Sequence, residues 1–169
     1  MFRSLLRQKT PNIRPVERGE MPFVADLARN TLSLFGKYDR LLPEWMRQPG
    51  IRTFIAEHHR QPAGLCMFGY FEDPQRGLFA DLLALAVAPQ FQHLGLGRAL
   101  LRFVIEESRR SGRVITELRL SVADTNERAR ALFASEGFRP LPYEIGTYDG
   151  GQVALRMGLR LDQSATYAA

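Results

Sequence analysis

Residues 81–101 read DLLALAVAPQFQHLGLGRALL, and this stretch decides the fold of the chain. Its apolar run at residues 82–88 has the length of one buried strand, and Pro89 ends the run because proline has no backbone donor. Beyond a loop that contains two glycines, apolar residues recur at helical spacing, at Leu96, Leu100, Leu101, Val104 and Ile105. The stretch therefore predicts a strand, a glycine loop and a helix in immediate succession.

The loop at residues 90–97 has the features of an anion-binding loop. Backbone N–H groups at the start of a helix have no intrahelical partner and attract negative charge, and glycines let a bulky anion approach the backbone. The Rossmann and P-loop fingerprints do not fit, because the only glycines are Gly95 and Gly97 and no lysine follows them. We therefore predict a pyrophosphate ligand, held by a loop of another type.

The spacing of this loop resembles that of a known family. The pattern Gln92-x-x-Gly95-x-Gly97 resembles the acetyl-CoA-binding motif of the GNAT superfamily of N-acetyltransferases. Further along, the segment NERARALFASEGF at residues 126–138 is similar to the helix of that family that begins at an asparagine. The order of the expected elements extends the resemblance to roughly residues 12–160, which is nearly the whole chain.

The resemblance implies an α/β (α+β) fold class, namely the GNAT fold. This fold is a mixed, strongly twisted sheet of about six to seven strands, flanked by about four helices, in which two central strands splay apart. We expect one such domain at residues 12–161, a flexible N-terminal segment at 1–11 and a flexible tail at 162–169. The length of 169 residues suits one domain, and no repeat or linker-like composition divides the chain.

The resemblance also implies where acetyl-CoA would bind, between the splayed strands. The backbone of three strand residues would pair with the pantetheine arm, the glycine loop would hold the pyrophosphate, and the second helix would line the opposite side. The implied cofactor-binding residues are Leu85, Ala86, Val87, Gln92, His93, Leu94, Gly95, Leu96, Gly97, Arg98, Asn126 and Phe133. Arg98 would add a charge-assisted contact, and the alternative for it is a solvent-exposed helix residue.

The implied reaction is transfer of acetyl from acetyl-CoA directly to a primary amine of a small molecule or a protein. An amine attacks only when it is neutral, so a proton must be accepted, and an acid can assist the departing thiolate. Where many family members carry an acidic Tyr, seven residues after the Asn, this chain has Phe133, which cannot donate a proton. Where the amino-terminal acetyltransferases carry a Glu, five residues before the Asn, it has Ser121.

Asp81 is the first candidate for the general base, directly or through water, because histone-type members of the family carry their basic Glu at this position. Strand alternation predicts that Asp81, Leu83 and Leu85 share one face, along the line of the thioester, and partial burial would raise the pKa of Asp81. The alternative is a strand-end carboxylate in solvent or paired with an arginine. The late strands offer two candidate proton donors, Tyr148 and Tyr143.

Composition bounds the remaining function classes. The net charge of +5 comes almost wholly from scattered arginines, since Lys9 and Lys37 are the only lysines, so we expect a phosphate-rich cofactor and no nucleic-acid partner. The neighbouring His58 and His59 have no acidic or cysteine companions at ligand spacing, so no metal is expected. No apolar run reaches the ~18 residues of a membrane span, so no membrane partner is expected either.

The remaining properties are the compartment, the acceptor and the oligomeric state. Cys66 is the only cysteine, which excludes an internal disulfide and favours a reducing, cytoplasmic location. The acceptor amine cannot be read from the sequence, and the resemblance leaves both a monomer and a homodimer formed through a late strand open.

A second function hypothesis is a domain that binds acyl-CoA without turnover, as a sensor or partner module. Phe133 supports this hypothesis, and the intact loop with Asn126 opposes it.

Overall fold

The structure is a computed structural model, and it describes residues 10–161, apart from the side chain of Glu144. Seven strands form one sheet in the order β1-β2-β3-β4-β5-β7-β6, and four α-helices flank it. The elements are β1 (Asn12–Pro15), α1 (Met21–Leu32), α2 (Tyr38–Trp45), β2 (Ile51–His58), β3 (Gln61–Asp73), β4 (Gly77–Val87), α3 (Leu96–Arg109), β5 (Glu117–Ala123), α4 (Glu127–Ser135), β6 (Arg139–Thr147) and β7 (Val153–Arg160). Apart from residues 10 and 11, the segments expected to be flexible lie outside the described residues.

The sheet is mixed, as expected, because β4 and β5 are parallel while the other neighbouring strands are antiparallel. Each expected helix and strand is present, so the fold prediction is confirmed. The strand β5 begins only at Glu117, although the apolar residues Val114 and Ile115 precede it. A tight turn comes first, in which the N–H of Ile115 donates to the carbonyl oxygen of Arg113 (2.9 Å), so that Ile115 is buried while Val114 is exposed.

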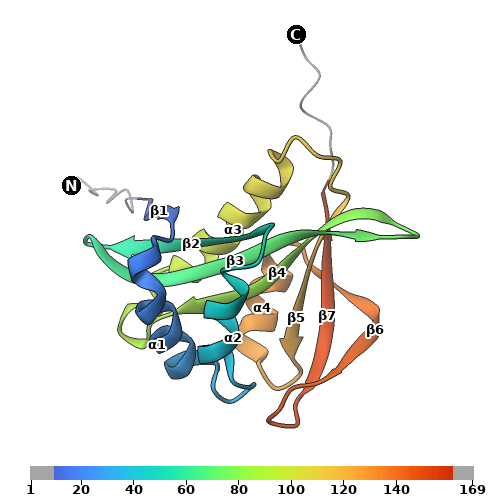
Figure 1. Cartoon of the computed structure of the whole chain (residues 1–169). Helices are drawn as coiled ribbons and strands as arrows, with labels where there is room; N and C mark the ends of the chain where they lie inside the picture. Colours follow the sequence, from blue (N-terminus) through green and yellow to red (C-terminus); the bar gives the residue numbers. More distant parts are fainter. Residues whose placement is uncertain (1–9, 162–169) are drawn as a thin grey trace, which may run out of the picture.

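The helices cover the two faces of the sheet in pairs, as Figure 1 shows. α1 and α2 lie over β3 and β4, where Leu27 and Leu42 belong to one buried cluster with Met67 of β3. α3 and α4 lie on the opposite face, where Leu101 and Phe133 belong to a larger buried cluster. On the face of α1 and α2, the half of the sheet formed by β5, β7 and β6 carries no helix (Figure 1).

A β-bulge in the middle of β4 exchanges the two faces of this strand. Phe68 of β3 is paired with Leu82, and Met67 with Ala84, so Leu83 has no partner on β3. Before the bulge, Leu82 packs with the cluster under α3 and α4, whereas Ala84 after it packs with the cluster under α1 and α2. One extra residue in a strand shifts the alternation of all following side chains by one.

The bulge overturns the expectation that Asp81, Leu83 and Leu85 share one face. Asp81 lies between Ala80 and Leu82, which both pack under α3 and α4, so its side chain points to the face of α1 and α2. Leu83 packs with the cluster on the same face as Asp81, but Leu85 packs with the cluster on the opposite face. The expectation was wrong because it assumed an uninterrupted period of two.

Candidate active site

The two parallel strands at the centre of the sheet separate after a short paired region. Residues 79–82 of β4 pair with residues 117–120 of β5, and beyond Leu82 and Leu120 the strands diverge. The edge of β4 that faces β5 is therefore unpaired at residues 83–87, and such an edge can bind an extended ligand as a further strand. This splay is the feature that the fold prediction placed at the cofactor site.

A cavity of about 90 Å³ lies in the gap between the splayed strands. It reaches both faces of the sheet, because α4 contributes to it on one side and the segment that joins α1 to α2 contributes on the other. Its lining includes residues 82–85 of β4, residues 120–123 of β5, Asn126, Ala129 and Phe133 on the α4 side, and Leu32, Phe35, Tyr38 and Tyr148 on the opposite side. Among the predicted site residues, the cavity thus brings together Leu85, Asn126, Phe133 and Tyr148.

The glycine loop leads from the end of β4 into α3. Gly95 is the N-cap of α3 and has a φ of 81°, a left-handed conformation that glycine adopts without steric cost. The first bond of the helix runs from the N–H of Ala99 to the carbonyl oxygen of Gly95 (3.0 Å). The N–H groups of Leu96, Gly97 and Arg98 therefore have no acceptor within the helix and are available to an anion.

Gly97 is not required by the fold of the protein itself. Its φ lies outside the left-handed range, and an added Cβ would meet only Leu132 at 3.7 Å and Val87 at 3.9 Å, which are ordinary contacts. The absent side chain leaves open space beside the free N–H groups of the loop. The loop residues therefore fit a pyrophosphate, and the cavity beyond them fits the narrow pantetheine arm of acetyl-CoA.

Asn126 and Gln92 fix the two segments that flank this space. Asn126 is the N-cap of α4, and its side-chain Oδ1 accepts from the N–H of Ala129 (3.2 Å). The Gln92 side chain donates from Nε2 to the carbonyl oxygen of Val87 (3.0 Å), which ties the loop to the end of β4. Both residues have roles in the fold that hold the loop and α4 in position around the cavity.

The side chain of Arg98 is engaged away from the loop. Its Nη1 donates to Ser135 Oγ (2.8 Å) and forms an ion pair with the carboxylate of Glu136, which also accepts from Arg102. These contacts lie at the end of α4 that is remote from Asn126. The charge-assisted contact of Arg98 with the pyrophosphate stays a prediction, while its backbone N–H belongs to the free groups at the start of α3.

Asp81 is paired with an arginine, as the alternative interpretation expected. Its Oδ2 accepts from Nη2 of Arg156 (2.6 Å), and Nη1 of Arg156 donates to Ser121 Oγ (2.9 Å). Burial raises the pKa of the Asp81 carboxyl, and the neighbouring Arg156 opposes this rise. The second oxygen, Oδ1, is buried without a hydrogen-bond partner among the described residues. A role for Asp81 as the base stays a prediction.

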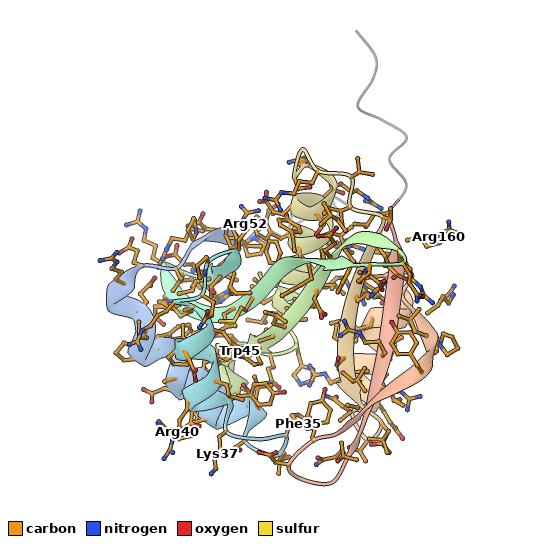
Figure 2. All side chains as sticks on the ribbon, turned by 45° about the vertical axis from the view of Figure 1, so that its right-hand side comes forward. Phe35, Lys37, Arg40, Trp45, Arg52 and Arg160 are labelled. Carbon is orange, nitrogen blue, oxygen red and sulfur yellow. The ribbon has the colours of Figure 1, made fainter. Side chains whose placement is uncertain are left out.

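Tyr148 lines the cavity at the turn between β6 and β7. Burial raises its pKa to about 12, so the phenol holds its proton throughout the neutral range. Its ring lies against Phe35, with centroids 5.4 Å apart, and Figure 2 shows Phe35 of the α1–α2 connection near the β6–β7 hairpin. The hairpin also bonds to this connection through the N–H of Asp149, which donates to the carbonyl oxygen of Phe35 (3.3 Å).

Tyr38 and Arg128 also border this region, and sequence reasoning missed Arg128. Tyr38 lines the cavity at the start of α2, and burial raises the pKa of its phenol. Arg128, in the first turn of α4, contacts the glycine loop at Gln92 and His93. No spacing rule connects Arg128 with the loop, so no sequence signal indicated it. Tyr143, the second candidate donor, lies on β6 outside the lining of this cavity.

Within residues 10–161, no group of three or more His, Cys, Asp and Glu residues is arranged to hold a metal ion. No helix in the same range combines the length and apolar character that a bilayer crossing requires.

Known proteins share both the sequence and the architecture. In the bS18-alanine N-acetyltransferase of Escherichia coli K12, 39% of 83 aligned residues are identical, and the alignment covers 47% of this chain and 55% of that protein. The chain spans about half the length of the curated relatives it matches. The crystal structure of the S18-alanine N-acetyltransferase from Escherichia coli superposes with a TM-score of 0.76 at 24% identity, covering 94% of this chain and 99% of the other.

A second structural neighbour is the spermidine N-acetyltransferase of Vibrio cholerae in complex with CoA and spermine. It superposes with a TM-score of 0.71 at 21% identity, covering 90% of this chain and 96% of the other. The sequence profile of the acetyltransferase (GNAT) family matches residues 22–138, from α1 to the end of the α4 region. This match includes the unpaired edge of β4, the glycine loop and the capped helix α4. The chain therefore belongs to the acetyltransferase (GNAT) family.

Proposed function

We propose that this protein transfers the acetyl group of acetyl-CoA to a primary amine. One observation carries the proposal: the gap between β4 and β5 holds a cavity that reaches both faces of the sheet, and the glycine loop with the free N–H groups of α3 follows the end of β4. A ligand with a pyrophosphate at one end and a narrow arm at the other fits this path. Acetyl-CoA supplies the activated acyl group, and the amine approaches from the face of α1 and α2.

In this proposal, the backbone provides most of the binding and alignment. The unpaired edge of β4 at residues 85–87 orients the pantetheine arm, and the free N–H groups at the start of α3 hold the pyrophosphate. The narrow cavity excludes bulk water from the reacting atoms. Alignment of two reactants in this way removes much of the entropic cost of the reaction.

Tyr148 and Asp81 are proposed for the proton transfers. The Tyr148 phenol stays protonated at neutral pH, so it can donate a proton to the departing thiolate. Asp81 does not itself line the cavity, so its unpartnered Oδ1 is proposed to accept the proton of the amine through a bridging water. Arg156 would then hold the base in place through its bond to Oδ2.

The lining of the cavity favours an amine with an apolar neighbourhood over a polyamine. No Asp or Glu is among the described residues that line it, whereas Phe35, Tyr38 and Tyr148 are. Asp39 and Asp73, which lie outside this lining, are paired with Arg29 and Arg119. The acceptor is therefore proposed to be a single amine of a protein or small molecule. The buried free thiol of Cys66 suits a reducing, cytoplasmic compartment.

A thermal-shift titration tests the cofactor, with acetyl-CoA, CoA and NAD each added alone. Both CoA species should raise the melting temperature in a dose-dependent manner, and NAD should not, because only a ligand of the folded state stabilises it. Release of free CoA with an amine panel then tests turnover. No shift at millimolar acetyl-CoA contradicts the cofactor assignment, and binding without CoA release contradicts the catalytic proposal.

Replacing Tyr148 with phenylalanine should lower kcat about 100-fold, because it removes one acid from the transition state. The melting temperature and the affinity for CoA should change little, since the hydroxyl has no hydrogen bond in the described structure. The matched control is Tyr143→Phe, which lies outside the cavity and should keep wild-type kcat. A Tyr148→Phe enzyme with kcat within twofold of wild type excludes Tyr148 as the acid.

A further inference from the structure

The side chain of Arg128 bridges the two segments that flank the entrance to the cofactor path. Its Nη1 lies 3.5 Å from Oε1 of Gln92, and its Nη2 lies 3.3 Å from Nδ1 of His93. Gln92 and His93 begin the glycine loop, whereas Arg128 belongs to the first turn of α4. The guanidinium is therefore held across the gap between the loop and α4, at the end where the loop N–H groups are free.

The contacts of Arg128 leave its charge uncompensated. Its two partners are an amide oxygen and an imidazole nitrogen, both at long distance, and no carboxylate among the described side chains of residues 10–161 forms a salt bridge with Arg128. Arg98, the arginine that the sequence placed at the phosphates, is instead committed to Glu136. A planar guanidinium with free donors beside a set of free backbone N–H groups matches the oxygens of a phosphate.

We propose that Arg128 binds the pyrophosphate of CoA and supplies the cationic contact at the glycine loop. The inference rests on the proposed function, since it takes CoA as the ligand of the loop. The pyrophosphate replaces the weak contacts to Gln92 and His93 with charge-assisted hydrogen bonds, and it thereby connects the loop to α4. The 3′-phosphate of CoA is the other anion within the same ligand, and the contacts to the loop itself favour the pyrophosphate.

Calorimetric titration of the full chain with CoA, dephospho-CoA and pantetheine tests this assignment. Arg128→Ala should weaken binding of CoA and of dephospho-CoA by the same factor, about tenfold, as expected for a charge-assisted contact at an exposed position. Binding of pantetheine, which has neither phosphate, should be unchanged. Arg128→Lys should lie between wild type and Arg128→Ala, because it keeps the charge and loses the planar fork.

Arg130→Ala is the matched control, because Arg130 is also exposed on α4 but donates to the carbonyl oxygen of Asp124 instead of contacting the loop. It should bind all three ligands like wild type. A loss confined to CoA would overturn the assignment to the pyrophosphate, and equal affinities of wild type and Arg128→Ala would overturn any role for Arg128. Wild-type protein that binds no CoA would refute the proposed function itself, an outcome distinct from both.

Discussion

Replacing Arg156 with leucine should lower the free energy of unfolding by about 3–5 kcal/mol at pH 7, the range for removal of one partner of a buried ion pair. The side chains of Arg156 and Asp81 are only 10% and 15% exposed, and they are joined by a bond of 2.6 Å. Leucine leaves the Asp81 carboxylate buried without its cation, and Ser121 loses the donor to its hydroxyl. Urea unfolding followed by circular dichroism measures the loss.

The size of this loss should depend on pH in a defined direction. Burial already raises the pKa of Asp81 above its unfolded value, and removal of Arg156 removes a cause that lowers it. A raised pKa means that the folded state favours the protonated carboxyl, so this contribution to stability is present in acid and is lost as pH rises through the folded pKa. Arg156→Leu should therefore be closer to wild type at pH 4.5 than at pH 8.

Two variants serve as references for Arg156→Leu. The double variant Asp81→Asn/Arg156→Leu should recover part of the stability, because it leaves no buried charge without a partner. Arg109→Leu should change stability by less than about 0.5 kcal/mol, since its ion pair with Glu106 is roughly half exposed. A deficit for Arg156→Leu that matches Arg109→Leu, or that does not vary with pH, would contradict the account of the buried pair.

Replacing Gly97 with glutamate should weaken CoA binding about a thousandfold and leave the fold intact. The carboxylate would occupy the space beside the free N–H groups and would meet the pyrophosphate as a like charge, which costs several kcal/mol. The fold tolerates the change, because the nearest atoms to an added Cβ are ordinary contacts at 3.7 and 3.9 Å. A carboxylate in the first turn even favours the helix. Calorimetry with CoA and thermal melting without ligand measure the two effects.

Gly95→Ala is the contrasting variant in the same loop. Gly95 has a φ of 81°, so alanine should cost about 1 kcal/mol of stability through backbone strain. An added Cβ at Gly95 would meet no atom within 4 Å, so the expected cost comes from the backbone conformation and not from a clash. Loss of stability in Gly97→Glu, with CoA affinity unchanged, would show that Gly97 serves the fold and not the ligand.

The amino-acid sequence by itself determined the element order and the fold family, and it predicted the cofactor side of the site. These rest on local signals: the apolar run before Pro89, the glycines at 95 and 97, and the asparagine that begins α4. Each signal works within about ten residues of chain, because hydrogen bonding, capping and φ preferences are local. They place the strand, the loop and the helices along the chain, whereas the splay of the central strands was implied by the resemblance to the family.

The acceptor side was decided only by the tertiary structure. The bulge at Leu83 depends on pairing with β3, the pairing of Asp81 depends on Arg156 of β7, and Tyr148 meets Phe35 across more than a hundred residues. Our proposal of Arg128 instead of Arg98 at the loop likewise rests on the ion pair of Arg98 with Glu136, which only the packing of α4 brings to α3. Register, ion pairing and cavity lining arise from contacts distant in sequence, and no local pattern encodes them.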